Sequence, residues 1–282
     1  MQPKEAIGLG VLLPAVVAAV VLLPLRLRRG LNERTARLLG GLAIALGFFA
    51  GYIGLGFAPL KPDDAWNWLP WLGLGAGIVG LVDQPWWLAA VARLAGAALA
   101  AWLLVPGWES ADLWRVDARV LLGLMVFLAW STDRPLPKAA NRLWLFLLLL
   151  ATAGGATVLM LGGSAKLAQV GGVLVGTVIA ANVLMPSGPT PPPGIVPVVA
   201  ILMPGLMASG LFDTHSAVPR ASYFLPAFVL LLLDNAALVP AESRFRFVLL
   251  VLLMLAAAVG LAYWAEPIDW REVFSAGASA PE

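Results

Sequence analysis

The chain contains no cysteine and a single histidine, His215, and only 12% of its 282 residues are charged. The absence of cysteine excludes disulfides, thiolate zinc sites, iron–sulfur clusters and a cysteine nucleophile, while one histidine cannot supply a multi-histidine metal site. A soluble domain carries about 25% charged residues. With 61% apolar residues, this composition cannot build a water-facing surface, and it predicts an integral membrane protein.

Sequence signatures of common enzyme classes are also missing. The chain has no nucleotide-binding G-x-x-x-x-G-K-[ST] loop, no H-E-x-x-H zinc motif and no G-x-S-x-G nucleophile elbow. It has no block of five or six like charges either, which argues against a nucleic-acid partner. We therefore expect no cofactor, no metal and no nucleic acid, and the sequence favours a protein that is not an enzyme.

Apolar runs long enough to cross a bilayer recur along the chain. A transmembrane helix needs about 20 apolar residues to cross a hydrocarbon core of about 30 Å. The sequence predicts an all-α integral membrane protein with about ten such helices; two runs are short, so a count of eight or nine is an alternative. The predicted spans are 7–25, 38–58, 68–82 (short), 86–105, 116–131 (short), 142–162, 167–186, 194–212, 221–240 and 246–264.

Basic residues predict the orientation, because they resist translocation and gather in cytoplasmic loops. With the N-terminus outside, ten Lys and Arg residues fall in inner loops, chiefly in 26–37, 134–142 and 244–246, and seven fall outside. The run 7–25 is longer than a signal-peptide core and is followed by arginines rather than by a small-residue cleavage site. We therefore predict a multi-pass protein of a cell inner membrane, with both termini and the tail 265–282 outside the cytoplasm.

Short sequence matches recur at a nearly constant offset, which is typical of an internal duplication. Each match falls at an equivalent place relative to the predicted spans, yet a chain so rich in Leu, Val, Gly and Ala also produces matches by chance. The matched pairs are GLVD at 80–83 with GLFD at 210–213, the glycine doublets 40–41 and 171–172, and LVPGWES at 104–110 with LVPAES at 238–243, at offsets of 130, 131 and 134 residues.

A duplication would divide the chain into two five-span halves, residues 1–133 and 134–264. Because five is an odd number, the second half would enter the membrane upside down, and the two halves would form inverted repeats. Inverted repeats are common in secondary transporters, in which two halves rock about a central substrate site.

Two ionisable residues lie inside predicted spans, where a charge costs a few kcal/mol on insertion scales. Arg93 lies in the fourth span and Asp234 in the ninth, at similar depths of roughly 9–12 Å from the inner end. These spans are equivalent members of the two halves, so pseudo-symmetry would bring them together and form a buried Arg93–Asp234 pair. The alternative is that Arg93 snorkels to the inner surface and that Asp234 caps its helix against Asn235.

Other polar and helix-breaking residues complete the predicted site. Asn182 in the seventh span is more typical of a hydrogen bond between helices than of a ligand contact, and glycines four residues apart typically let helices approach closely. Pro204 in the eighth span is expected to face the glycine-rich segment 73–80 of the third. Interrupted helices in equivalent positions point to a transport site, because unwound backbone can face a substrate. The predicted site residues are Arg93, Asp234, Asn235, Asn182 and Pro204.

These observations favour a secondary transporter of a small solute, with its site between the third, fourth, eighth and ninth spans near the membrane midplane. Asp234 is the expected proton or cation acceptor. One alternative is a lipid-modifying membrane enzyme, which would need Asp63 and Asp64 of the segment KPDDAWNW. Another is a non-catalytic subunit or scaffold, whose partner would be a second membrane protein. All three functions place the chain among membrane lipids.

Overall fold

A computed structural model describes residues 8–27, 33–57, 64–79, 86–105, 113–131, 138–184, 194–213, 217–234 and 243–266 of the chain. Within these ranges the chain forms ten α-helices, one π-helical segment and one 3₁₀ helix, and it contains no strand. The prediction of an all-α protein is confirmed for this part of the molecule.

Each predicted apolar run coincides with one α-helix. A π-helical segment, η1, leads directly into the first α-helix, and a 3₁₀ helix, η2, leads into the third. The elements are η1 (Gly8–Leu12), α2 (Leu13–Leu27), α3 (Glu33–Gly54), η2 (Ala65–Trp68), α4 (Leu69–Val79), α5 (Trp86–Leu104), α6 (Leu113–Ser131), α7 (Lys138–Leu161), α8 (Ala165–Leu184), α9 (Ile195–Asp213), α10 (Arg220–Asp234) and α11 (Arg244–Ala265).

Seven of the described helices are long enough and apolar enough to cross a membrane: α2 together with η1, then α3, α5, α7, α8, α9 and α11. The other three fall short for identifiable reasons. Helix α4 has 11 residues and α10 has 15, while α6 has 19 residues but carries three charged ones near its start. By length and composition the chain is a multi-pass membrane protein with seven such helices, and the predicted count of ten stays a prediction.

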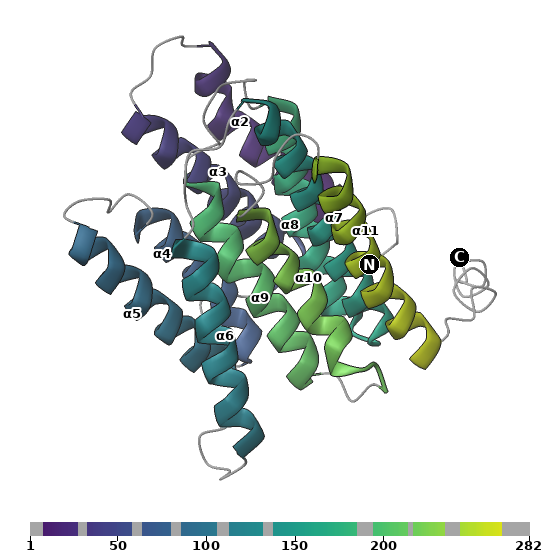
Figure 1. Cartoon of the computed structure of the whole chain (residues 1–282). Coiled ribbons are helices and arrows are strands. Elements are labelled where there is room, and N and C mark those ends of the chain that lie inside the picture. The colour runs from purple at the N-terminus through teal and green to yellow at the C-terminus, as the bar shows by residue number, and fades with distance from the viewer. Residues whose placement is uncertain are drawn as a thin grey trace, which may run out of the picture.

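Neighbouring helices run in alternating directions, as expected when a chain crosses a layer repeatedly (Figure 1). The end of α3 lies beside the start of α2, because a Cβ on Gly54 would lie 2.6 Å from a methyl carbon of Leu13. The start of α3 lies beside the end of α4, because a Cβ on Gly41 would lie 3.4 Å from the Cα of Gly77. The helices are therefore aligned as a bundle with two distinct ends.

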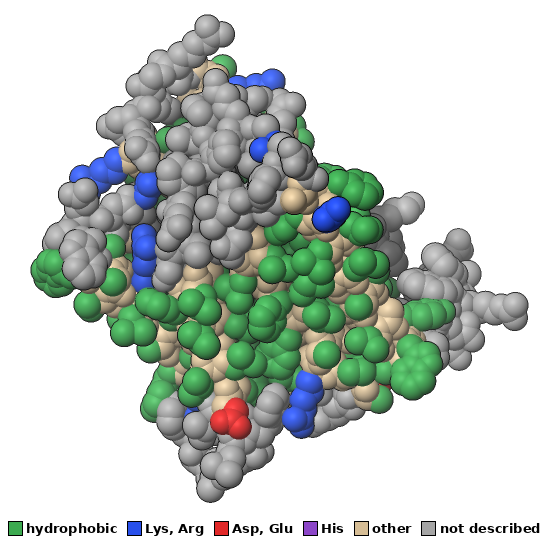
Figure 2. Space-filling view, in the orientation of Figure 1, with side chains coloured by type: hydrophobic (Ala, Val, Ile, Leu, Met, Phe, Trp, Pro, Cys, Tyr) green, Lys and Arg blue, Asp and Glu red, His purple; other side chains and the backbone are tan. Residues whose placement is uncertain are grey.

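The described charges are unevenly divided between these two ends. One end, which we call the arginine-rich end, carries Arg26, Arg34, Arg37, Arg244 and Arg246 at the end of α2 and the starts of α3 and α11. The opposite end carries Asp64, Asp117, Lys166, Arg220 and Glu266. On the face in Figure 2 the charged side chains lie toward the borders of an apolar band. Which end faces the cytoplasm stays a prediction from the basic residues.

Helix α9 lies at the centre of the bundle. It packs against α3, α4, α5, α6, α7, α8 and α10, and every residue from Ile195 to Gly210 is buried. By contrast, α2 and α11 lie at the periphery, with 22% of the most apolar stretch of each buried. The described part of the molecule is thus built around one enclosed apolar helix. The predicted site lies on this helix and on the helices that touch it.

Candidate functional site

Helices α4 and α9 form the interface at which the sequence places the site. Glycines of α4 lie directly on α9: a Cβ on Gly73 would lie 3.2 Å from a methyl carbon of Leu202, and a Cβ on Gly77 would lie 3.7 Å from one of Val198. In the described residues, the two glycines therefore let side chains of α9 pack directly on the backbone of α4, as expected for glycines four residues apart.

Helix α9 is continuous, so the expected interruption of this segment is wrong. Pro197 lies in the first turn, where its missing N–H needs no partner within the helix. Pro204 lies inside the helix and removes one backbone hydrogen bond without ending it. Transmembrane helices tolerate an internal proline because neighbouring helices hold them in place, and α9 is surrounded by such neighbours.

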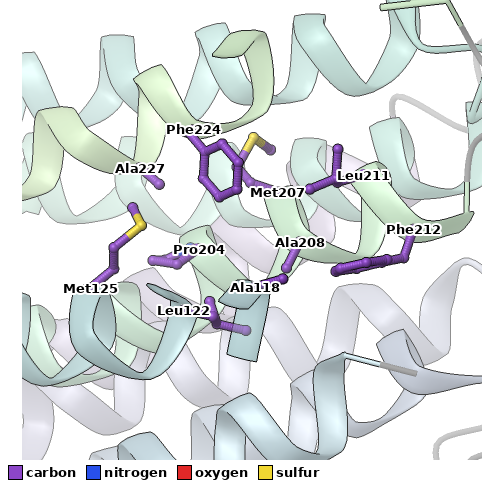
Figure 3. Close-up of a pocket in the computed structure, with 10 residues that line it drawn as sticks. All are labelled: Ala118, Leu122, Met125, Pro204, Met207, Ala208, Leu211, Phe212, Phe224 and Ala227. Atoms are coloured by element: carbon purple, nitrogen blue, oxygen red, sulfur yellow. The ribbon is translucent and has the colours of Figure 1, made fainter. Parts of the chain in front are cut away.

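Pro204 lines a small cavity between α6, α9 and α10. In Figure 3 the ten labelled side chains, among them Met125, Met207 and Phe224, surround one space and include no polar group. The cavity has a volume of about 10 Å³, and a second cavity beside Trp144 on α7 is equally small. Such a volume has room for at most one water molecule, and apolar cavities of this kind stay dry. Pro204 therefore lies in an apolar packing region.

Arg93 and Asp234 lie on helices that share neighbours. Arg93 is half-buried on α5, and Asp234 is the last residue of α10. Helices α6 and α9 each pack against both α5 and α10, while α5 and α10 do not pack closely against each other along the described residues. The described residues therefore show no close packing of these two helices. The side chain of Asp234 and all of Asn235 lie outside the described residues, so an Arg93–Asp234 pair stays a prediction.

Asn182 connects two neighbouring helices. Its side-chain nitrogen Nδ2 donates to the carbonyl oxygen of Leu145 on α7 at 2.9 Å and to that of Val178 on its own helix at 3.0 Å. This is the interhelical hydrogen bond that the sequence favoured for this residue. Its amide nitrogen is therefore held by backbone carbonyls in this conformation.

Two further buried polar side chains form a pair that the sequence analysis missed. The hydroxyl of Tyr52 on α3 donates to Oδ1 of Asn67 in η2. Phe57 and Trp66 pack around Tyr52, with ring centroids 5.2 Å and 5.8 Å from that of the tyrosine. The signal in the sequence is the segment KPDDAWNW, where an asparagine stands between two tryptophans and follows two aspartates. The pair fastens η2 to α3.

Two serines carry buried hydroxyls that form no hydrogen bond in the described structure. Ser209 on α9 is 1% exposed and Ser222 on α10 is fully buried, and neither Oγ has a partner. Ser209 is the only polar side chain between Ile195 and Phe212. It follows Gly205 by about one turn, so it lies on the side of α9 that Leu69 of α4 and Leu104 of α5 contact. An isolated serine in a long apolar span was the missed signal.

The lipid-modifying enzyme stays a prediction, because only one of the two aspartates that it requires lies in the described part of the chain. Asp64 is exposed at the start of η2, and Asp63 lies outside the described residues. Among the residues described, no group of three or more His, Cys, Asp or Glu side chains could hold a metal ion.

No family model, no curated protein and no solved structure matches the chain. By the length and composition of its described helices, the chain belongs to the class of helical, multi-pass membrane proteins, and in the described residues helix α9 is enclosed by its neighbours.

Proposed function

We propose that the chain is a secondary transporter of a small solute, and that α9 moves against α3 and α4 during transport. The supporting observation is the position of α9, which contacts α3, α4, α5 and α6 from the first predicted half as well as α7, α8 and α10 from the second. A displacement of one half relative to the other would therefore change the surroundings of α9 more than those of any peripheral helix.

The contact surfaces of α9 suit such a movement at the arginine-rich end. A Cβ on Gly41 would lie 3.0 Å from the carbonyl oxygen of Gly194, and Gly77 lies against Gly41. Gly194 immediately precedes α9 and has a φ of 90°, a conformation that favours glycine. Packed helices can slide past one another by small shear movements. Here the three glycines lie where α3, α4 and α9 meet, and no side chain on them obstructs such sliding.

The proposed inverted repeats are compatible with part of the helix packing. If α2–α6 and α7–α11 are equivalent, then α3 corresponds to α8 and α4 to α9, and each of these pairs is in contact. Helix α2 also packs against α8, whereas the equivalent pair of α7 and α3 does not pack closely in the described residues. Because a rocking transporter adopts different arrangements of its two halves in each state, such departures from symmetry are expected.

Three polar groups supply the proposed chemistry. Ser209 offers an unpaired buried hydroxyl on the side of α9 that faces α4 and α5, where a solute or a water molecule could accept or donate a hydrogen bond. Asp234 is proposed as the proton or cation acceptor, with Arg93 as its alternating partner. Asn182, Asn235 and Pro204 complete the proposed set, with Pro204 on the central helix α9 and Asn182 on its neighbour α8.

A reversible cross-link gives the sharpest test, because the natural chain has no cysteine to interfere. Gly77→Cys combined with Val198→Cys would join α4 to α9, where a Cβ on Gly77 would lie 3.7 Å from a methyl carbon of Val198. Gly154→Cys combined with Leu255→Cys would join α7 to the peripheral α11, where a Cβ on Gly154 lies 4.0 Å from that of Leu255, a separation that suits a disulfide.

Both variants would be reconstituted in lipid vesicles and screened for proton-coupled currents with a panel of amino acids, sugars and organic anions. We expect oxidation to stop the current in the α4–α9 variant, reduction to restore it, and the α7–α11 variant to stay active. Asp234→Asn should remove the dependence on the proton gradient, while Asp117→Asn at the opposite end should not. Equal currents from the oxidised and reduced α4–α9 variant would contradict movement at this interface.

A non-catalytic subunit is the second candidate, and the close packing of α4 on α9 favours it. A glycine-lined interface in which a Cβ on Gly73 would lie only 3.2 Å from Leu202 also suits a rigid framework. In that case no solute on the panel produces a current, and the cross-linked protein still copurifies with a membrane-protein partner from its native membrane.

A further inference from the structure

The lipid-facing surface of the molecule is hollowed between α5 and α6, which pack against each other, with α5 at the edge of the bundle (Figure 1). The hollow has a volume of about 270 Å³, far larger than the cavities inside the bundle. It opens sideways, because its rim residues Leu94, Trp102, Val120 and Leu124 are between 50% and 65% exposed. We call this hollow the α5–α6 groove.

Small side chains create the groove. Ala97, Ala98 and Ala101 on α5 and Gly123 on α6 line it, and a Cβ on Gly123 would lie 3.5 Å from the Cβ of Ala101. The two helices therefore touch at the floor, while the space above them stays open toward the lipid. At membrane depth there is no water to fill an apolar hollow, so the natural occupant is a hydrocarbon chain.

Arg119 supplies a positive charge at one end of the groove. It lines the groove, and its Nη2 donates to the carbonyl oxygen of Val105, the residue after the end of α5, at 3.1 Å. Arg119 lies six residues into α6, about 9 Å along the helix axis. Because long side chains on a helix point toward its N-terminus, the guanidinium extends toward the membrane boundary.

The length of the groove suits an acyl chain, and the chemistry of Arg119 suits a phosphate. From Trp102 to Leu94 the groove follows eight residues of α5, which is about 12 Å at the helical rise. A guanidinium presents N–H donors in a planar fork that matches the oxygens of a phosphate, and in Arg119 one of them already binds Val105 while Nε is buried. An apolar channel that ends in an arginine at headgroup level therefore fits an acyl chain joined to a phosphate.

We propose that the α5–α6 groove binds one acyl chain of an anionic phospholipid, whose phosphate is held by Arg119. The lipid fills the space above Ala98 and Gly123 and stabilises the contact between α5 and α6. This site is separate from the α4–α9 interface and does not depend on the transport function proposed above.

Photo-crosslinking tests the proposal with the full-length protein in vesicles. The probes are phosphatidylglycerol and phosphatidylcholine, each with a diazirine in the middle of one acyl chain, and the labelled peptides are identified by mass spectrometry. We expect phosphatidylglycerol to label the α5–α6 groove about fivefold more than phosphatidylcholine does, as one arginine at a membrane surface allows. The exposed face of α11 around Leu252 and Leu253 should show no such preference.

Three variants distinguish binding of the phosphate by Arg119 from binding of the acyl chain in the groove. Arg119→Gln should bring the labelling ratio of the two lipids in the groove close to one. Ala98→Phe fills the groove from its open side and should reduce labelling there by both lipids, whereas Ala256→Phe makes the same change on the exposed face of α11 and should leave the groove unaffected.

Equal labelling of the groove and of α11 would overturn the proposal, because it would mean that only the surrounding bulk lipid is detected. An unchanged lipid preference in Arg119→Gln would remove Arg119 as the phosphate ligand. Ala98→Phe does not touch the hydrogen bond to Val105, so it tests the groove even if Arg119→Gln fails to fold.

Discussion

Helices α9 and α11 have similar hydropathy but opposite surroundings. Their most apolar stretches have hydropathies of 2.1 and 2.5, yet 83% of that stretch is buried in α9 and 22% in α11. Helix α9 touches seven other α-helices, whereas α11 packs closely against only α7 and α10 in the described residues. In a membrane, lipid chains are as apolar as leucine, so apolar content does not decide which helix lies inside.

Side-chain size separates the two helices better than hydropathy does. Helix α9 has Gly205, Ala208, Ser209 and Gly210 near its centre and end, and these allow close approach by Leu104 and others. Helix α11 presents large side chains to the outside, including Leu249, Leu250, Leu252, Leu253 and Trp264. Interfaces between membrane helices are enriched in small residues because they bring backbones together, and α9 follows that rule.

The largest expected effect comes from enlarging a glycine of α9. In Gly210→Val the new Cβ would lie 2.2 Å from a methyl carbon of Leu159 and 3.0 Å from the Tyr223 ring. Overpacking of this kind costs about 3 kcal/mol, so the thermal unfolding temperature in detergent should fall clearly. Gly260→Val on α11 meets no atom within 4 Å of its Cβ and should leave that temperature unchanged. Equal effects would contradict the assignment of inside and outside.

A smaller loss is expected when the buried tyrosine pair is broken. Tyr52→Phe removes the donor to Asn67 and leaves a buried amide oxygen without its partner, which costs about 1–3 kcal/mol. Tyr263→Phe on α11 is the matched control, since Tyr263 is 45% exposed. Thermal unfolding of both variants would show whether only the interior tyrosine contributes, and a stable Tyr52→Phe variant would mean that the hydrogen bond is not important.

The hydrogen bond between α7 and α8 should contribute less to stability than the Tyr52–Asn67 pair does. Asn182→Leu removes the donor to the Leu145 carbonyl, and interhelical hydrogen bonds in membranes average about 0.6 kcal/mol. Val183→Leu, at an exposed neighbouring position of the same helix, controls for the added leucine. A loss several times larger in Asn182→Leu would show that the residue does more than join two helices.

The smallest effect is expected at the unpaired serine of α9. Ser209→Ala removes a buried hydroxyl that has no partner, so stability should be unchanged or should rise by up to about 1 kcal/mol. If the serine is a solute contact, the transport current should fall although the unfolding temperature does not. A clear loss of stability would instead show that the hydroxyl has a partner in the folded protein.

The positions of the helices could be predicted from the sequence because an apolar run of sufficient length is a direct signal. The run 86–105 corresponds to α5 (Trp86–Leu104), and the run 194–212 corresponds to α9 (Ile195–Asp213). The run 68–82 was expected to be short, but the last described residue of α4, Val79, was not predicted, since the apolar residues continue beyond it. Length and composition identify a span, but they do not identify where its helix ends.

The neighbours of each helix were much harder to predict. Asn182 was correctly expected to join two helices, because an amide in a span needs a partner, but its partner Leu145 could not be named. The unbroken path of α9 through Pro204 depends on the helices around it, which no local pattern reveals. Ser209 and the Tyr52–Asn67 pair were missed because a single polar residue acquires meaning only once its burial is known.

The central position of α9 also has a consequence for the order in which the protein is made. Synthesis proceeds from the N-terminus, so α3 to α8, six of the seven α-helices that α9 contacts, have been made before it, and only α10 comes afterwards. The newly made α9 therefore meets six of its neighbours already in place, while the side that α10 will cover is still open to the lipid. A nascent chain halted before Arg220 would present that open side to membrane quality-control proteases, and the arrival of α10 would remove their access.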